Sequence, residues 1–255
     1  MIFLKKKFIF NTVRIVMEDD KIGQYLDKDK YQKIVIITYN KLNFGKDFYV
    51  HHKLTPNIYL DRKLNDILLG FNPSTRNQVN RSLREQDLKF VSADKNFSQI
   101  YEVYRSFEYA QDRVPFSGET MKDYLAFSAY YKGELVSLIL CFDSFPYLRS
   151  RSICSKRLEK DYGNKKKYRI ISVATRGLVY EICKYGKEHG YKLFDLGSMP
   201  ADLRNPKKAG IAEFKSSFGG KLEDEYTYTY KSKLYRFFEK LVKIKLFLFK
   251  TLKLR

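Results

Sequence analysis

The sequence contains no tryptophan, and it has only three cysteines, three histidines and six prolines. Disulfide frameworks and metal centres need cysteines or histidines at characteristic spacings, and Cys141, Cys154 and Cys183 lie far apart along the chain. An odd number of isolated thiols is typical of proteins in a reducing compartment, so we expect a cytoplasmic location. The histidines form no ligand motif, and we therefore expect no metal.

Long hydrophobic runs are also missing. No window reaches the roughly 18 consecutive apolar residues that a membrane-spanning helix requires. The opening sequence MIFLKKKFIF interrupts its apolar residues with three lysines, so it lacks the continuous apolar segment of a signal peptide. We expect a protein that is soluble or peripheral to a membrane, with a core built from its 21 tyrosines, 20 phenylalanines and aliphatic residues.

Acidic residues are the minority among the charged ones. The chain has 49 lysines and arginines against 29 aspartates and glutamates, which gives a formal net charge of +20 over 255 residues. Such an excess predicts anionic partners: nucleic acid, an anionic membrane surface or phosphorylated small molecules. The acidic residues are scattered among the basic ones, so the pattern does not resemble a basic tail.

The first quarter of the chain favours β-structure. Runs rich in Val, Ile, Tyr and Phe, separated by Asn, Gly and Asp, predict strands at residues 8–16, 33–39 and 47–60. A helix is then predicted to begin at Asn72-Pro73, with asparagine as N-cap and proline in the first turn, and to end near residue 87. It carries Arg76, Arg81 and Arg84 on a mostly polar surface.

The middle of the chain alternates helices with a meander of strands. The spacing of apolar residues predicts a strand at 88–91, an amphipathic helix at 97–108 and a second helix at 118–125. Three strands follow within residues 126–158, and the turn Lys132-Gly133 between two apolar runs indicates a hairpin.

Residues 165–220 hold the most informative pattern. KKKYRIIS predicts a basic loop leading into a helix that ends at Gly190, and residues 191–196 predict a buried strand containing Asp195. A short helix at 211–218 and a strand at 226–230 follow. Basic residues at a helix start form an anion site, because the first N–H groups have no partners within the helix. The pattern therefore predicts a phosphate site with a carboxylate nearby, as an enzyme would have.

Four segments carry a resemblance to a known superfamily: NPSTRNQVNRSLRE, AYYKGELVSLIL, KEHGYKLFDLGSM and GIAEFKSSFGGKLEDEYTYTY. They resemble the GNAT acyltransferases, and residues 65–230 resemble the branch that contains FemAB-type peptidoglycan-bridge aminoacyltransferases and nucleotide-sugar N-acyltransferases. The chain departs from that branch in two ways. It has no helical arm for tRNA, and residues 164–169 replace the superfamily's glycine-rich phosphate loop.

This resemblance implies a mixed α+β GNAT fold, with a central mixed sheet flanked by helices over residues 65–230. Residues 1–64 would form an abbreviated, β-rich GNAT-like region, and residues 231–255 a basic amphipathic helix. That helix either packs on the protein or binds a membrane surface. The co-substrate implied is acyl-CoA, with no tightly bound cofactor.

The resemblance also assigns the donor site. The thioester arm would lie where strands 148–155 and 191–196 part, and backbone N–H groups near Ile153 and Cys154 would polarise its carbonyl. The diphosphate of the donor would bind the basic loop and the first helical turn; the residues implied are Lys165, Lys166, Lys167, Arg169, Ile171, Ser172 and Val173. The alternative is a solvated loop whose charges contact nothing.

For the acceptor, Asp195 would take a proton from the amine, orient it, or simply cap loop N–H groups. Further acceptor contacts are assigned to Arg76, Arg81, Arg113, Ser198 and Lys215. Tyr228 would protonate the leaving thiolate, although alternating Tyr and Thr also suits ordinary strand packing. Cys154 has no histidine near it in sequence, which disfavours covalent catalysis.

Together these points predict an N-acyltransferase that uses acyl-CoA and acylates a nucleotide-linked (dTDP- or UDP-) amino sugar for bacterial surface polysaccharide. No specific nucleic acid is expected as a partner, and membrane contact through the C-terminal helix is left open. Two alternatives remain. One is aminoacyl-tRNA-dependent transfer to a peptidoglycan precursor, and the other is a non-catalytic protein that binds polyanions or membranes.

Overall fold

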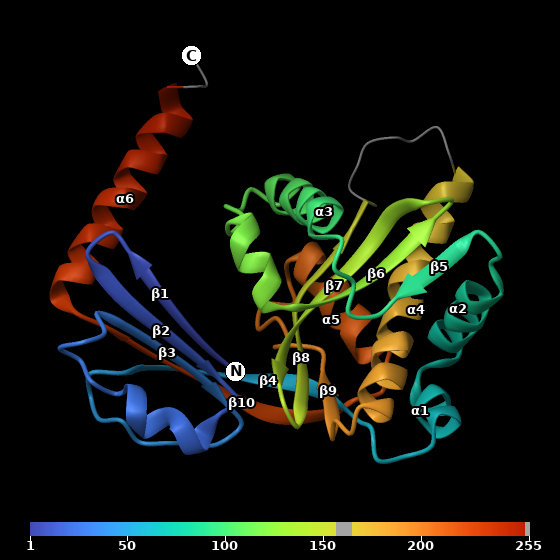
Figure 1. Ribbon diagram of the computed structural model, residues 1–255, viewed down its shortest axis with the longest axis horizontal. Helices are drawn as coiled ribbons and strands as arrows, with labels where there is room; N and C mark the ends of the chain where they lie inside the picture. The colour runs from blue at the N-terminus through green and yellow to red at the C-terminus, as the bar shows by residue number, and fades with distance from the viewer. Residues whose placement is uncertain (157–164, 253–255) are drawn as a thin grey trace. The chain divides into compact units, whose positions relative to one another are not determined.

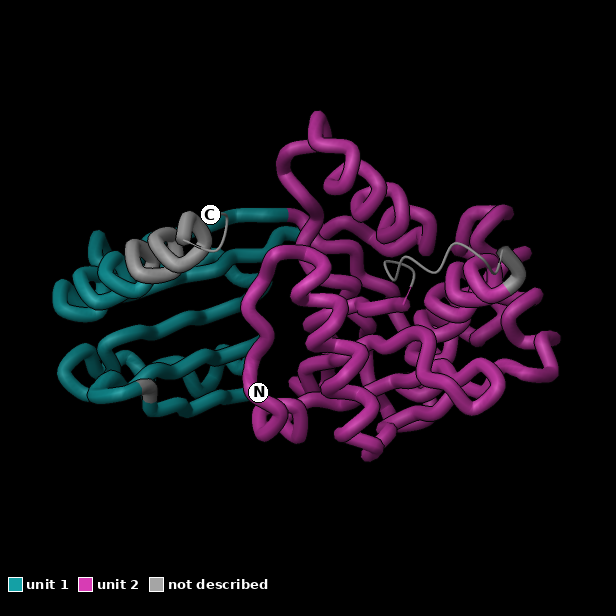
Figure 2. The backbone as a smooth tube through the Cα atoms, turned by 90° about the horizontal axis from the view of Figure 1, so that it is seen from above, with its two compact units in different colours: residues 1–53, 224–255 teal, residues 54–223 magenta. Residues whose placement is uncertain are grey.

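The computed structural model describes residues 1–156 and 165–252, apart from the side chains of residues 7, 165–166 and 243–252. The chain folds into two compact units (Figure 2). Unit 1 combines residues 1–53 with residues 224–255, and unit 2 consists of residues 54–223. Unit 1 is therefore assembled from two distant parts of the sequence, whereas unit 2 is continuous.

Unit 1 is mainly β-structure with one long helix. A β1–β2 hairpin precedes the short helix η1, and β2 and β3 pair in parallel while β3 and β10 pair antiparallel. Its core includes Ile15, Ile36 and Tyr228. The elements are β1 (Ile2–Lys7), β2 (Phe10–Val16), η1 (Asp19–Tyr25), β3 (Lys33–Thr38), the first part of β4 (Tyr49–Tyr59), most of β10 (Lys221–Lys231) and α6 (Lys233–Leu252).

Unit 2 alternates helices with strands along the sequence (Figure 1). Its elements are α1 (Leu64–Gly70), α2 (Pro73–Arg84), β5 (Leu88–Val91), α3 (Phe97–Ala110), η2 (Gly118–Asp123), β6 (Leu125–Tyr131), β7 (Glu134–Ser144), β8 (Tyr147–Ser155), α4 (Lys165–Glu188), β9 (Leu193–Asp195) and α5 (Pro206–Ser216). The strand order of the ten-stranded mixed sheet is β1-β2-β3-β10-β4-β9-β8-β7-β6-β5. Among the described strand pairs of unit 2, β8 and β9 are parallel and the others are antiparallel.

The two faces of the unit 2 sheet are covered by different helices. Ile139 and Cys141 of β7 belong to the same core cluster as Leu178 and Ile182 of α4. The intervening side chains of β7 point to the opposite face, because side chains alternate along a strand. There Phe142 packs edge-on against Tyr124, next to η2, with ring centroids 5.4 Å apart. We call these the α4 face and the α3 face.

Local sequence signals predicted several elements correctly. Asn72 caps α2 by accepting the Thr75 N–H at 2.7 Å, with proline at the first helical position. The β6–β7 hairpin turns at Lys132 and Gly133, which have φ values of 51° and 80°. Gly190, with φ of 75°, follows the end of α4 as predicted.

Other predictions need correction. Residues 165–169 are not a loop, because α4 already includes Lys165. The segment contains no glycine or proline to end a helix, and Ile170 and Ala174 bury its apolar side. β9 is shorter than predicted, and α5 begins earlier, at Pro206, with Asn205 as N-cap. β1 and α1 were not predicted.

Gly177 lets α2 and β5 approach α4 closely. A Cβ atom at this position would lie 2.4 Å from Ser82 Oγ and 2.5 Å from Phe90 Cζ. Both neighbours lie within packed structure, with Ser82 buried on α2 and its hydroxyl donating to the Val79 carbonyl. Only glycine fits at this point of the helix packing.

We expect Gly177→Ala to destabilise the protein by about 1–3 kcal/mol, because overpacking outweighs the better helix propensity of alanine. Gly210→Ala in α5 is the matched control, since no atom lies within 4 Å of a Cβ there. Denaturant unfolding of both variants measures the difference. A Gly177→Ala protein as stable as the Gly210→Ala protein would contradict this account of the packing.

Candidate active site

Strands β8 and β9 pair over only three residues and then part. Their parallel register ends with Arg149 opposite Asp195. Beyond this pair the chain after β9 follows β4, with the Leu196 N–H donating to Pro56 O at 3.1 Å and the Met199 N–H to Leu54 O at 2.7 Å. β8 continues to Ser155. The predicted parting of two parallel strands is confirmed.

The continuing part of β8 has no strand paired on its β9 side within the described residues. Alternate N–H groups along this segment point to that side, as strand geometry requires. Ser150 pairs with Cys141 and Ser152 with Leu140, so Arg151 is an extra residue that forms a β-bulge. Within the described residues, the N–H groups on this side of β8 are therefore not used in the sheet, next to a bend in the strand.

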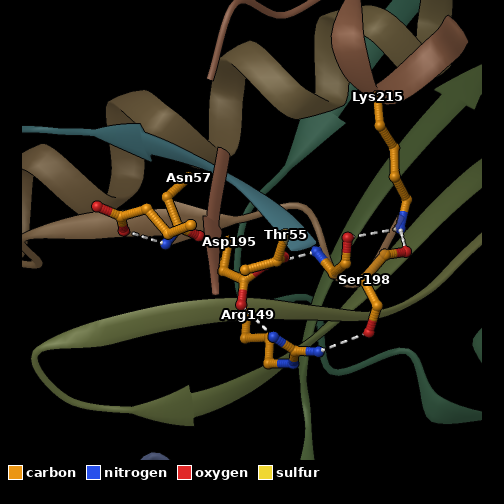
Figure 3. A network of polar contacts seen from close by, with 8 residues as sticks. Thr55, Asn57, Arg149, Asp195, Ser198 and Lys215 are labelled. Carbon is orange, nitrogen blue, oxygen red and sulfur yellow. Dashed lines mark hydrogen bonds and ion pairs between the residues drawn. The ribbon is translucent and has the colours of Figure 1, made fainter. Parts of the chain in front are cut away.

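Asp195 lies at the last paired position of β8 and β9 and is fully buried; its polar contacts are drawn in Figure 3. Its carboxylate forms an ion pair with the buried guanidinium of Arg149. Thr55 donates a hydroxyl hydrogen bond to Oδ1, and the Gly197 N–H donates to the same oxygen at 2.6 Å. Both carboxylate oxygens are thus engaged, which supports a positioning role for Asp195 over that of a proton acceptor.

Ser198 and Lys215 belong to the same polar network (Figure 3). Arg149 Nη2 lies 3.5 Å from Ser198 Oγ, and Lys215 Nζ donates to the carbonyls of Gly197 and Ser198 at 2.8 and 2.9 Å. The structure therefore brings the predicted Asp195, Ser198 and Lys215 together. Lys215 therefore links α5 to Gly197 and Ser198, which follow β9.

A second polar cluster lies on the α3 face. Glu108, on α3, is only 7% exposed and pairs with Arg113 at 3.1 Å from Oε2 to Nε. The guanidinium of Arg151 lies 5.8 Å from the ring of Phe116, which packs on Tyr104 with centroids 4.2 Å apart. The Nε of Arg151 is buried and has no hydrogen-bond partner among the described residues.

The pKa shifts in this cluster show which charged groups act on the same side chains. Burial and the charge of Glu108 raise the pKa of Tyr104 to about 12, while a hydrogen bond with the Phe116 N–H and the charge of Arg151 oppose the shift. Burial also raises the pKa of Cys154, with Glu108 adding to the shift and Arg113 and Arg151 opposing it. Cys154 is therefore a protonated, buried thiol at neutral pH, which agrees with the argument against covalent catalysis.

The predicted donor residues are placed differently from expectation. Ile171 and Val173 are buried in α4, and their N–H groups lie inside the helix, so they do not form its open first turn. Ser172 receives Arg176 Nη1 at its carbonyl and hydroxyl, both at 3.4 Å. Arg169 is exposed. The side chains of Lys165 and Lys166 lie outside the described residues.

Lys167 is held by a carboxylate. Glu134, at the start of β7, pairs with Lys156 and with Lys167, each at 2.8 Å. This bridge joins the end of β8 to the beginning of α4. It also reduces the positive charge available to a diphosphate at the predicted position.

Three predicted residues lie elsewhere. Arg76 and Arg81 are on α2, which packs against α4, whereas Asp195 points to the other face because its neighbour Phe194 lies in the α4-face core. The Arg76 guanidinium reaches the Leu69 carbonyl at 3.4 Å. Tyr228 is a core residue of unit 1, and its hydroxyl accepts the Leu42 N–H at 2.5 Å.

Ile153 and Cys154 lie on the predicted strand, in the part of β8 that pairs with β7 but no longer with β9. The residues that the sequence analysis missed are Arg149, Arg151 and Glu108. A signal existed for the first two, because the predicted strand LRSRSICS carries two arginines next to a predicted buried aspartate. A buried carboxylate needs a cation or several donors, so one of these arginines was its natural partner.

This architecture is GNAT-like, and three solved structures share it at low sequence identity. FemX matches with a TM-score of 0.60 and 12% identity, over 89% of this chain and 83% of its own. The C-terminal DUF2156 domain of an Agrobacterium fabrum protein described as a lysylphosphatidylglycerol synthetase matches with a TM-score of 0.57 and 13% identity, over 89% of this chain and 79% of its own. L-PGS from Bacillus licheniformis matches with a TM-score of 0.54 and 15% identity, over 91% of this chain and 81% of its own.

No protein-family model and no curated protein matches the sequence. At these identities the likeness establishes the fold. The activity has to be argued from the residues of the site.

We expect Asp195→Asn to destabilise unit 2 by about 3–5 kcal/mol, because it leaves the buried guanidinium of Arg149 without its counter-charge. Asp202→Asn, at a partly exposed aspartate paired only with exposed cations, is the control and should change stability by less than about 1 kcal/mol. Chemical unfolding of both variants gives the comparison. An Asp195→Asn protein as stable as the wild type would show that the ion pair does not stabilise unit 2.

The Glu134 bridge predicts a pH dependence. Burial raises the pKa of Glu134, but hydrogen bonds and charge from Lys156 and Lys167 outweigh this and lower it below its ordinary 4.5. A lowered carboxyl pKa stabilises the fold above the unfolded value, and this contribution is lost as pH falls through the folded pKa. Glu134→Gln should therefore be less stable than the wild type at neutral pH, by about 1 kcal/mol or less at this partly exposed site. The difference should disappear at about pH 3.

Unfolding measured at both pH values tests this, with Glu102→Gln, an exposed position on α3, as the control. A stability gap that persists unchanged in acid would show that the charges on the bridge contribute nothing.

Proposed function

We propose that this protein is an N-acyltransferase that moves an acyl group from an activated donor to an amine at the place where β8 and β9 part. The observation that carries the proposal is the end of the β8–β9 ladder at Arg149 and Asp195, beyond which no described strand pairs with the backbone donors on that side of β8. Beside these donors lie a carboxylate and two arginines on the α3 face. An acyl transfer needs both features, since the carbonyl must be polarised and the amine must lose a proton.

The backbone of β8 is suited to the donor. N–H groups fixed in a strand are pre-organised and stabilise the oxyanion that develops when the carbonyl is attacked. The bulge at Arg151 bends the strand there and re-aims these groups. Asp195 and Arg149 fix the point at which the strands part, so their role is to position the donor.

Glu108 is suited to the acceptor. Its carboxylate lies on the same face as Arg151 and Tyr104 and is held by Arg113. It would accept a proton from the incoming ammonium. The free amine then attacks the donor carbonyl, a C–N bond forms, and the bond to the leaving group breaks. With a thioester donor the products are an amide and a free thiol, the thiol taking up the released proton.

For the substrates, our first candidate is a coenzyme A thioester as donor and a nucleotide-linked amino sugar of bacterial surface polysaccharide as acceptor. Arg113 and Arg151 border the acceptor side, and arginine recognises phosphate oxygens through paired hydrogen bonds. The Nε of Arg151, which has no hydrogen-bond partner among the described residues, is a donor of this kind. The net charge of +20 supports an anionic substrate.

The second candidate is transfer of an aminoacyl group from aminoacyl-tRNA. Two observations favour it: the likeness to FemX and to lysylphosphatidylglycerol synthetases, the latter named for an aminoacylated lipid product, and the ion pair that occupies Lys167. A donor that is not held by a diphosphate does not need the cations that Glu134 neutralises. The absence of a helical tRNA arm in the sequence weighs against this candidate.

A free-thiol assay with a panel of acyl-CoAs and amino nucleotide-sugars tests the first candidate. Amine-dependent thiol release above hydrolysis is the expected result. Transfer from radiolabelled aminoacyl-tRNA that disappears after ribonuclease treatment would instead establish the second candidate. If neither donor is consumed, the protein is not an acyltransferase of this kind, and salt-dependent binding to polyanions would be its remaining predicted property.

Glu108→Gln should lower kcat by about 10²–10⁴-fold, as the loss of a general base does, with little change in KM. Glu102→Gln provides the matched control, since it makes the same change at an exposed position of the same helix. Steady-state kinetics of the two variants, with circular dichroism to confirm folding, give the answer. Equal kcat values for both variants would exclude Glu108 from proton transfer.

A further inference from the structure

The tip of the β1–β2 hairpin exposes two apolar side chains where a soluble turn normally carries polar residues. Phe8 and Ile9 are 71% and 74% exposed. Phe8 also has a φ of 56°, in the left-handed region that glycine or asparagine usually occupies. A bulky aromatic residue at such a position costs conformational energy. Its ring contacts Phe238 of α6, but most of the side chain stays exposed.

Helix α6 has a second exposed apolar stripe. Its inner side packs on the hairpin, with Tyr235 and Phe238 against Phe10 at centroid distances of 5.2 and 5.3 Å. Its outer side exposes apolar residues three and four positions apart, which places them on one face; these are Leu234, Phe237 and Leu241. They lie on the side of the helix next to the packed one, because Leu234 and Phe238 are four positions apart.

The two exposed sets adjoin each other within unit 1. Phe8 contacts Phe238 edge-on with centroids 5.5 Å apart, and Figure 1 shows α6 running beside the β1–β2 hairpin. We call Phe8, Ile9, Leu234, Phe237 and Leu241 the unit 1 apolar face. It combines residues from opposite ends of the sequence into one surface.

Basic residues surround this face. Lys233, Arg236 and Lys240 are exposed on α6 beside the apolar stripe, and Lys5 and Lys6 are exposed on β1. In the described side chains of α6 the one acidic residue is Glu239, which pairs with Lys231 at 2.7 Å. The surroundings of the apolar face therefore carry a strong positive charge.

We propose that the unit 1 apolar face binds the surface of an anionic lipid bilayer. Exposed aromatic and aliphatic side chains insert at the boundary between head groups and acyl chains, while lysine and arginine attract anionic lipid. No helix in the described part of the chain is long and apolar enough to cross a membrane, so the contact is peripheral. A second copy of the chain is a poorer occupant, because two faces with this basic rim repel each other. The inference does not depend on the proposed acyl transfer.

Co-sedimentation of the full chain with vesicles tests the proposal. Binding is expected to vesicles of equal phosphatidylglycerol and phosphatidylcholine and to be at least tenfold weaker with pure phosphatidylcholine, because about 1 kcal/mol is gained per basic residue near an anionic surface. Equal binding to both kinds of vesicle, or binding to neither, would overturn it.

Two sets of variants separate this face from the general positive charge. The triple change Leu234→Ser, Phe237→Ser and Leu241→Ser should weaken binding about tenfold or more. Its control makes the same change at three exposed apolar positions of unit 2 helices, Leu69→Ser, Leu83→Ser and Tyr109→Ser.

Neutralising Lys233, Arg236 and Lys240 to Gln should weaken binding more than neutralising Lys89, Lys184 and Lys192, which are exposed elsewhere. Equal losses for face and control variants would mean that binding follows net charge alone.

A fluorescence probe gives an independent measurement in protein that stays folded. The chain has no tryptophan, so Phe237→Trp introduces a single reporter. Its emission should shift to shorter wavelength when phosphatidylglycerol vesicles are added, whereas Leu83→Trp should not respond. A shift that appears without vesicles and grows with protein concentration would show that a second copy covers the face, and would overturn the proposal.

Discussion

The buried ion pair between Arg149 and Asp195 is the constraint on which the rest of the site depends. A guanidinium and a carboxylate are costly to remove from water, and the cost is recovered only when geometry and hydrogen bonds are complete. Here the pair occupies the last register position of the β8–β9 ladder and recruits Thr55 from β4 and the Gly197 N–H. Three strands are thereby fixed at one point. The place where β8 separates from β9 is set by electrostatics as much as by backbone pairing.

Two structural properties of β8 beyond Arg149 follow from that fixed point. The backbone of β8 is freed on one side, and the bulge at Arg151 turns a cation toward Phe116 and the α3 face. Glu108 on α3 and Arg113 on the loop after α3 lie on the same face, so the proposed donor and acceptor sites are built from different elements. For Asp195 the sequence analysis left proton transfer, orientation of the amine and capping of loop N–H groups open, and its engagement by Arg149, Thr55 and the Gly197 N–H favours a positioning role. In our proposal the proton acceptor is instead Glu108, on a helix that the sequence predicted only as amphipathic.

Local signals predicted much of the fold and less of the site. The Asn72 cap, the Lys132-Gly133 turn and the amphipathic period of α3 each depend on residues close in sequence, and the structure contains all three. The start of α4 was wrong because a run of lysines was taken for a loop, although lysine is a good helix former. β1 was missed because its three apolar residues are followed directly by three lysines, so the strand has no alternating pattern. The Arg149–Asp195 pair could not be found in this way, because it joins residues 46 positions apart and no local pattern reports such a contact.

Unit 1 has a further consequence for the order in which the protein becomes structured during synthesis. Strand β3 pairs with β10, and α6 packs on the β1–β2 hairpin, so the first 53 residues need partners from residues 224–255. Unit 2 is continuous and can fold while the chain is still on the ribosome. The N-terminal strands leave the ribosome first but complete their sheet last. During that interval the edge of β3 lacks the strand that pairs with it in the folded protein.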